Sequence, residues 1–421
     1  MKKIFLFMIV AGMIYDRSPA QTSSPIPTFS FSILTCSPGP DLYSVFGHTA
    51  IRCKELTGAA IFDEVYNYGT FEFSDDFYIK FAKGKLDYML SRSGFDEFMY
   101  EYQMTGRGVW EQQLNLSPTQ SEELLKLLED NLKPENRYYR YDFFYDNCST
   151  RVRDIIQDVC ANNGDSINFS YVPPHPVTFR DAIQNNLNYM PWSDFGIDLA
   201  LGTGCDKTME KRDYSFLPDS LLQEFDYALR GGNKITSQPN EILAQKFHLA
   251  KPNFWKPTNV FFLFLVLQVT LGIVLLKRKT PPALQAISPS SSRSVGTAEN
   301  CHIGKSPYRQ LIIPDRILLF ISGLVGALII FLWFFTDHTT TQANWNILWA
   351  NPLNLGFAFV CGKRKWQRWY AGVFMISLFI MFFGFFLFTQ RLHFATIPIA
   401  LGLLFVCIKI IRPKALTNLS I

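Results

Sequence analysis

A series of apolar runs in the C-terminal half constrains this chain most, because such runs fold in a lipid bilayer. The runs cover residues 258–276, 317–335, 347–361, 370–388 and 395–411. They approach or reach the length of about 20 residues that a spanning helix needs, and Asn351-Pro352 interrupts the third. The sequence therefore predicts an all-α bundle of about five transmembrane helices.

Groups of Lys and Arg between these runs predict how the bundle is oriented. They lie at residues 277–279, 363–368 and 412–414. Five spans put all three groups in the cytoplasm and the N-terminal part outside, whereas four spans would leave one group outside. The outer loop then contains Asp337 and His338, at the depth of lipid headgroups. We expect these two polar side chains to contact substrate, and the alternative is an ordinary hydrated loop.

The N-terminus has the pattern of a secretory signal. Lys2 and Lys3 precede an apolar stretch that is too short to span comfortably, and Ser18-Pro19-Ala20 resembles a cleavage site. The alternative is an uncleaved short anchor, and in both cases the following segment is exported. The expected organisation is a signal peptide at 1–20, a periplasmic domain at 21–256, a flexible cytoplasmic connector at 277–316, and spans at 257–276, 317–335, 345–362, 369–389 and 393–411.

The net charge and the cysteine content limit the classes of function that this chain can have. The formal net charge is +4, which cytoplasmic loops account for, and no basic tract with interleaved aromatics indicates nucleic-acid binding. We expect no cofactor and no metal. Five of the eight cysteines are exported, so at least one stays unpaired in an oxidising compartment. The pairs Cys36–Cys53 and Cys160–Cys205 would leave Cys148 free, unless all five are reduced.

Local patterns predict an α+β exported domain. Alternating residues indicate strands at 29–35, 48–52 and 60–68. Ser117 and Gln120 have capping-box spacing ahead of a helix at 119–132. A second helix is expected from Cys148, with one apolar face formed by Val152, Ile155, Ile156 and Val159.

Two short motifs carry the predicted chemistry. His48 opens a strand behind Gly47, and Cys148 follows Asn147 at a helix start. The helix macrodipole lowers the pKa of a thiol there, and first-turn N–H groups can hold an oxyanion. Taken alone, each residue has a simpler interpretation: His48 as a hydrogen-bonded core histidine, and Cys148 as a small buried or disulfide-bonded cysteine. Together they predict a nucleophile and its base in a papain-type arrangement, circularly permuted because His precedes Cys.

A third catalytic group should lie on the strand beside that of His48. Asp63 and Asn67 share one face of that strand, and Glu64 replaces them if the register is off by one. Arg107 and Tyr68 are expected to line the pocket, the alternatives being a surface charge and a strand-end aromatic. Asn147 is expected to contact substrate.

Three segments, SVFGHTAIR at 44–52, YNYGTF at 66–71 and YDFFYDNCSTR at 141–151, resemble the periplasmic thiol domain of a bacterial lipoprotein N-acyltransferase family. The Asn-Cys element is also similar to that of the lecithin–retinol acyltransferase superfamily, a permuted papain-like (NlpC-type) fold. The outer loop at Asp337 and the Asn351-Pro352 step fit this family as well. By direct match to its motifs, Cys148 takes the role of nucleophile and His48 that of base.

This resemblance implies a ping-pong acyl transfer at the bacterial inner membrane. A phospholipid would acylate Cys148, and the thioester would then acylate the α-amine of a diacylglyceryl-modified lipoprotein N-terminus. Two rival hypotheses remain open. One is a cell-wall peptidase or amidase of the NlpC type, and the other is a non-enzymatic membrane scaffold in which Cys148 is structural.

Overall fold

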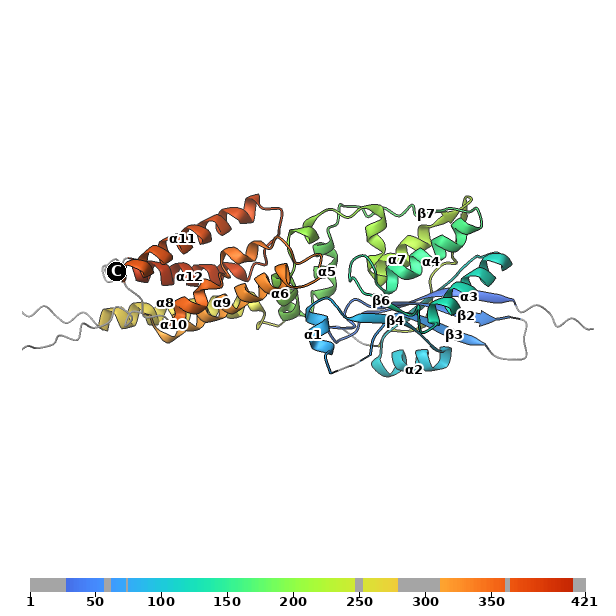
Figure 1. The fold of residues 1–421 in the computed structure, drawn as a ribbon, viewed down its shortest axis with the longest axis horizontal. Helices are drawn as coiled ribbons and strands as arrows, with labels where there is room; N and C mark the ends of the chain where they lie inside the picture. The colour runs from blue at the N-terminus through green and yellow to red at the C-terminus, as the bar shows by residue number, and fades with distance from the viewer. Residues whose placement is uncertain are drawn as a thin grey trace, which may run out of the picture.

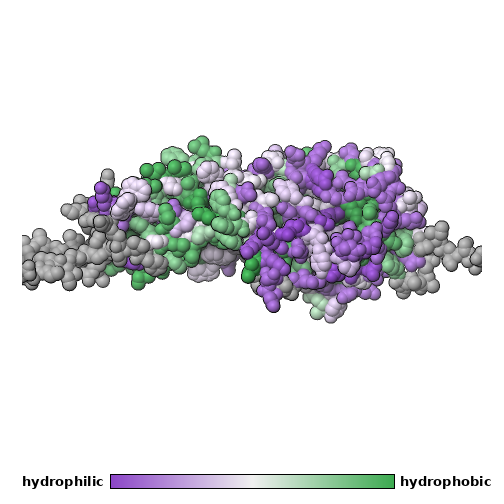
Figure 2. All heavy atoms as spheres, viewed as in Figure 1, coloured by the Kyte–Doolittle hydropathy of each residue, from purple (hydrophilic) through white to green (hydrophobic). Residues whose placement is uncertain are grey.

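The computed structural model describes residues 28–56, 62–72, 75–246, 253–278, 311–359 and 364–411. The expected signal peptide and most of the expected connector lie outside the described residues. The molecule is elongated, with a mixed α/β domain at one end and a helical region at the other (Figure 1). Hydrophilic residues dominate the visible surface of the α/β domain, and hydrophobic residues gather on the helical region (Figure 2).

A seven-stranded antiparallel sheet forms the centre of the N-terminal domain, in the order β10-β5-β1-β2-β3-β4-β6. Its strands are β1 Phe29–Cys36, β2 His48–Glu55, β3 Asp63–Thr70, β4 Asp87–Gly94, β5 Val109–Gln113, β6 Tyr138–Arg140 and β10 Asn240–Leu243. A smaller sheet contains β7 Ile167–Asn168, β8 Leu229–Arg230 and β9 Asn233–Lys234. Strands predicted around residues 29–35, 48–52 and 60–68 are therefore neighbours in one sheet.

Helices surround this sheet. They are α1 Phe77–Ala82, α2 Phe95–Thr105, α3 Pro118–Leu132, α4 Cys148–Asn162, α5 Phe179–Leu187, α6 Pro191–Ala200 and α7 Pro218–Tyr227, with 3-10 turns η1 Thr203–Asp206 and η2 Lys211–Phe216. The predicted capping box of α3 is confirmed: the Ser117 hydroxyl accepts from the Gln120 N–H, and the Gln120 side chain accepts from the Ser117 N–H. Such a cap stabilises a helix by about 1 kcal/mol.

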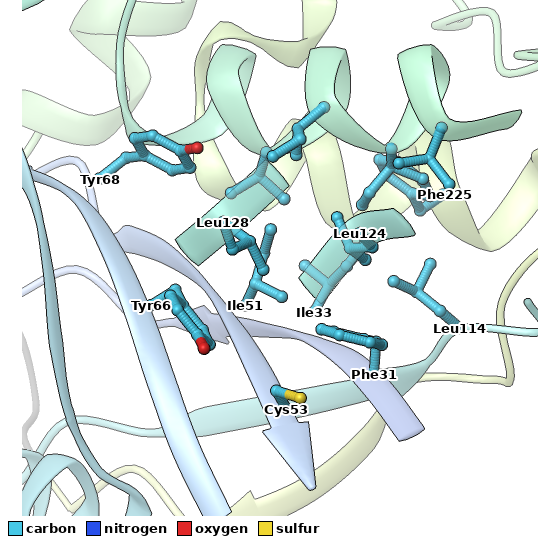
Figure 3. Packing of buried hydrophobic residues seen from close by; sticks show 14 of the residues in the cluster. Phe31, Ile33, Ile51, Cys53, Tyr66, Tyr68, Leu114, Leu124, Leu128 and Phe225 are labelled. Carbon is cyan, nitrogen blue, oxygen red and sulfur yellow. The ribbon is translucent and has the colours of Figure 1, made fainter. Parts of the chain in front are cut away.

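Strand alternation divides the core into two layers. Ile51 and Tyr66 point to the face covered by α3 and α4, where Leu124, Leu128 and other apolar side chains pack (Figure 3). Ala50 and Val65 point to the opposite face, against Phe98 and Tyr102 of α2. The apolar face predicted for α4 is confirmed, since Val152, Ile155, Ile156 and Val159 are all buried. Each such side chain contributes about 1.5–3 kcal/mol when fully buried.

The C-terminal region is helical. It contains α8 Pro257–Arg278, α9 Ile313–Phe334, η4 Trp345–Leu348, α10 Leu353–Phe359, α11 Arg364–Leu387 and α12 Thr396–Ile411. Within the described residues, three helices (α8, α9 and α11) are long and apolar enough to cross a membrane. The apolar helix α12 is shorter, and α10 spans only seven residues. A bundle of five spans stays a prediction.

A buried ion pair joins helices α8, α9 and α12. Lys409 of α12 pairs with Asp315 of α9, and both side chains are almost fully buried. The Gln268 Nε2 of α8 donates to the Asp315 carboxylate at 3.0 Å and to the Gly402 carbonyl at 3.3 Å. Because each charge has its counter-ion and Gln268 also binds the Asp315 carboxylate, these contacts tie the three helices to one another.

Side-chain amides from the outer loops bind the end of α6. Asn344 Nδ2 donates to the Leu199 carbonyl at 2.7 Å, and Gln390 Nε2 donates to the Leu201 carbonyl at 2.9 Å. The last carbonyls of a helix lack partners within the helix, so these contacts satisfy groups that would otherwise need water. The two domains are therefore joined through hydrogen bonds as well as through the chain.

The six described cysteines, Cys36, Cys53, Cys148, Cys160, Cys205 and Cys407, are free thiols. The proposed pairs Cys36–Cys53 and Cys160–Cys205 are therefore wrong. Cys53 lies opposite Phe31, five residues from Cys36 and roughly 17 Å along the strand. Cys160 and Cys205 are buried in two different apolar clusters.

Candidate active site

His48, Asn67 and Cys148 gather at the end of the sheet that faces the membrane helices. His48 opens β2, and β3 ends nearby at Thr70 and leads on to α1. In Figure 1, α1 lies beside the junction with the helical region. The N–H of Asp337, in the outer loop after α9, donates to the carbonyl of Lys83 directly after α1 at 2.9 Å. This end of the sheet is therefore the one nearest the membrane.

Gly69 allows helix α4 to begin against this end of β3. It has a φ of +87°, at a break in the register of β3 with β4 between Tyr68 and Thr70. A Cβ built on Gly69 would lie 3.4 Å from the Cβ of Cys148 and 3.6 Å from the ring of Tyr141. A glycine fits the left-handed conformation without strain, and this position is in van der Waals contact range of the cysteine. The bulge thus sets Cys148 directly beside the strand that neighbours His48.

The Cys148 sulfur lies within a set of hydrogen-bond donors. It is hydrogen-bonded to the His48 ring, and it also accepts from the Thr49 backbone and the Ser149 side chain. The hydroxyls of Thr49 and Ser149 are 3.0 Å apart. Both Cys148 and His48 remain partly exposed, so a substrate can reach them.

Asn67 holds the other side of the imidazole. The His48 Nε2 and the Asn67 Oδ1 are 3.2 Å apart, so this nitrogen carries the proton and donates to the amide oxygen. The Nδ1 atom is then the ring nitrogen available to Cys148. Asn67 reaches His48 because the register of β2 with β3 places the two residues on one face of the sheet. A buried Asn67 therefore fixes both the ring orientation and its tautomer.

The thiol and the imidazole shift each other's proton affinity. Burial alone would raise the pKa of Cys148, but the nearby imidazolium and its hydrogen bond, with the Thr49 and Ser149 donors, lower it overall. Burial alone would lower the pKa of His48, but the thiolate and the Asn67 hydrogen bond raise it overall. Both shifts favour a thiolate–imidazolium pair, which is the reactive form of a thiol nucleophile.

Asn147 is buried and caps α4. Its Oδ1 accepts from the N–H groups of Ser149 at 2.8 Å and Thr150 at 3.0 Å. Its Nδ2 donates to the carbonyls of Phe143 and Phe216 at 2.7 and 2.8 Å. Because Asn147 occupies two first-turn donors, the N–H of Cys148 itself is the first-turn group that remains for an oxyanion.

Asp63 and Glu64 are not brought to His48. The Asp63 carboxylate binds the Arg52 guanidinium through two contacts of 2.6 and 2.7 Å, near the other end of β3. Glu64 lies opposite Cys53 in the register, on the other face of the sheet from Asn67. Of the candidates for the third group, the structure places only Asn67 against the imidazole.

The remaining expected site residues are placed around this end of the domain. Tyr68 is buried in the core, and its hydroxyl accepts from Asn131 Nδ2 at 2.7 Å. Arg107 is buried beside the connection between β1 and β2. Asp337 lies 3.7 Å from Arg140 and His338 packs against Gly84, so both brace the outer loop against the domain.

Thr49 and Ser149 were not assigned roles from the sequence. Each immediately follows a predicted catalytic residue, and each directs a donor to the sulfur. Their positions next to His48 and Cys148 are the signal that would have identified them.

The chain matches a family model described as the Lnb N-terminal periplasmic domain over residues 17–185, which include His48, Asn67 and Cys148. It also matches the Lnb transmembrane domain over residues 300–415. No curated protein and no solved structure matched the chain. The two matches cover most of the chain and confirm the resemblance found in the sequence. The protein therefore belongs to the Lnb family and is a membrane protein with a periplasmic N-terminal domain and a C-terminal transmembrane domain.

Proposed function

We propose that this protein is a thiol acyltransferase that moves a fatty acyl chain from a membrane phospholipid to the α-amine of a diacylglyceryl-modified lipoprotein N-terminus. One observation carries the proposal: the Cys148–His48–Asn67 arrangement lies at the membrane-facing end of the sheet. A lipid ester and a lipidated N-terminus both reside at the bilayer surface. The membrane domain holds the thiol where both substrates are.

The first half-reaction acylates Cys148. Its thiolate attacks the ester carbonyl carbon, the S–C bond forms, and the negative charge moves to the carbonyl oxygen near the Cys148 N–H. The C–O bond to the glycerol then breaks, and the His48 imidazolium gives its proton to the departing oxygen. A lysophospholipid leaves, and neutral His48 remains beside a thioester.

The second half-reaction returns the enzyme to its starting state. The neutral α-amine of the acceptor attacks the thioester carbon, and His48 accepts the proton that the amine loses. The S–C bond breaks, so the thiolate and imidazolium form again. A thioester suits this step because amines attack it readily while water must be excluded.

An NlpC-type peptidase shares the same thiol and imidazole. The contacts of Asp337 with the segment after α1, and of Asn344 with α6, distinguish this chain, since they hold the site close to the bilayer. A soluble peptidoglycan substrate requires no such placement, so the lipid substrate is the better match.

The test is acylation of the full chain in phospholipid vesicles, read by intact mass. We expect the parent to gain one acyl group that neutral hydroxylamine removes. Cys148→Ser should lose this labile adduct and Cys160→Ser, a substitution of a buried cysteine in the same helix, should retain it. An unlabelled parent, or a labile adduct in Cys148→Ser, overturns the proposal.

The acceptor is tested in cells by mass spectrometry of lipoprotein N-termini. We expect triacylated N-termini with the intact gene and diacylated N-termini with Cys148→Ser. Unchanged N-terminal acylation in that variant would show that the acceptor is a different molecule.

A further inference from the structure

Arg107 differs from the other deeply buried arginines of the described chain. Arg180 forms ion pairs with Asp198 and Asp206 at 2.7 and 2.9 Å, and Arg153 pairs with Asp154 at 2.7 Å. Arg107 is only 6% exposed, yet it forms no ion pair with any carboxylate among the described residues. Its Nη2 is buried without a hydrogen-bond partner there.

The contacts that Arg107 does make leave its charge uncompensated. Its Nε donates to the Ser37 carbonyl at 2.8 Å, and its guanidinium lies 4.7 Å from the centre of the Tyr102 ring. A carbonyl and a ring supply partial charges only. A buried charge without a counter-ion is costly, and such a group is retained where an anion completes it.

Arg107 lies close to the candidate active site. Ser37 directly follows Cys36, and Cys36 is the register partner of both His48 on β2 and Val109 on β5. A Cβ on Gly39 would lie 3.2 Å from the Arg107 Cδ, so the guanidinium stem contacts the loop that leads from β1 to His48. The Arg107 charge also acts electrostatically on His48. A ligand held by Arg107 is therefore a close neighbour of the base.

We propose that Arg107 binds the phosphate of the glycerophospholipid that donates the acyl chain, an inference that rests on the proposed acyl transfer. A guanidinium presents two parallel N–H donors to a phosphate. The single negative charge of the phosphodiester supplies the counter-ion that Arg107 lacks. The acyl esters are on the glycerol that bears this phosphate, so one contact places the scissile carbonyl near Cys148. Donor recognition then depends on the phosphate and not on the headgroup beyond it.

Binding measured without turnover tests this inference. The full chain carrying Cys148→Ala, in detergent, is titrated by calorimetry with dihexanoyl phosphatidylglycerol and with uncharged dihexanoylglycerol. We expect Arg107→Gln to weaken binding of the phospholipid by about tenfold or more, because a charge-assisted hydrogen bond is lost, and to leave dihexanoylglycerol binding unchanged. Arg107→Lys should weaken phospholipid binding less than Arg107→Gln.

Arg92→Gln is the matched control, since Arg92 is a half-exposed arginine paired with Glu129, and it should bind both lipids as the parent does. Equal weakening for both lipids, no weakening, or no phospholipid binding by the parent overturns the inference. If Arg107→Gln does not fold, Arg107→Lys replaces it, provided that its unfolding midpoint is unchanged. Its binding of the phospholipid and of dihexanoylglycerol is then compared in the same way. If Arg107→Gln loses phospholipid binding but the protein with Cys148 intact forms no acyl-enzyme, the anion site is supported and the acyl transfer is overturned.

Discussion

At the residue scale, Cys148 and His48 stabilise each other's charged forms. The imidazolium lies beside the sulfur, and Asn67 holds the imidazole from its other side. Burial favours the neutral forms of both groups, but their mutual interaction outweighs this effect on the two pKa values. Reactivity of the thiol should therefore report directly on the imidazole and on its orienting amide.

The pH dependence of Cys148 alkylation tests this coupling. Iodoacetamide reacts with the thiolate, so the rate rises with pH through the pKa of the thiol. Because that pKa is lowered, we expect the rise in the parent below the pH at which an ordinary cysteine reacts. His48→Ala should move the rise to higher pH, and Asn67→Ala should move it in the same direction by less. A profile that is unchanged in His48→Ala would contradict the coupling.

Only part of this site can be predicted from sequence. His48 and Cys148 are recognisable because each lies in a local motif, a strand start after glycine and a helix start after an N-cap. Asn67 and Asp63 share one face of one strand, and sequence cannot choose between them. The choice depends on distance along β3, since Asp63 meets Arg52 whereas Asn67 reaches the His48 ring. Whether Arg107 meets a carboxylate is likewise a question of tertiary packing.

At the scale of elements, the bulge in β3 joins the strand to the helix that carries the nucleophile. Gly69 fits there because of its positive φ, and a side chain at this position would lie in contact with Cys148. The position therefore combines two demands on one residue.

Gly69→Ala separates these demands when it is compared with Gly164→Ala. Both glycines have positive φ, at +87° and +77°, but nothing lies within 4 Å of a Cβ at Gly164. Each alanine should cost about 1–3 kcal/mol of unfolding free energy from backbone strain. Only Gly69→Ala should also slow alkylation of Cys148, measured on the same samples. Equal alkylation rates in both variants would show that the contact with Cys148 is unimportant.

The elements that sequence predicted are those with strong local signals. The strands around β1, β2 and β3 alternate clearly, α3 has a capping box, and α4 has an apolar face. Strand β4 and helices α5, α6 and α7 were not predicted. Their sequences are short and mixed, and tertiary contacts stabilise them: β4 pairs with β3 and β6, α7 packs on α4 and β1, and α5 packs on α6.

At the scale of the whole molecule, the end of α6 is one of the places where the two domains meet. Asn344 donates to the carbonyls of Leu199 and Ala200, and Gln390 donates to that of Leu201. Next to these carbonyls, Arg180 forms ion pairs with Asp198 and Asp206. The orientation of the candidate active site over the bilayer depends on this junction.

Asn344→Leu should loosen the junction. Loss of the Asn344 amide removes two hydrogen bonds to partly buried carbonyls and costs about 1–2 kcal/mol. We therefore expect amide exchange of residues 198–202, measured by mass spectrometry, to become about tenfold faster. Asn354→Leu is the control, because Asn354 is an equally buried amide whose partners, Ser322 and Tyr370, lie within the membrane helices. Similar acceleration in both variants would indicate general destabilisation and not loss of the junction.

The ion pair of Lys409 with Asp315 has a consequence for biosynthesis. The ribosome makes Gln268 and Asp315 first, and Lys409 arrives only with α12, the last described helix. Until then the Asp315 carboxylate, in the first turn of α9, lacks the Lys409 counter-ion and has only hydrogen-bond donors such as the Gln268 amide and the Ile312 N–H. The helix pair α8 and α9 is therefore incomplete without the final helix. A chain that terminates before Lys409 leaves the Asp315 carboxylate without its counter-ion.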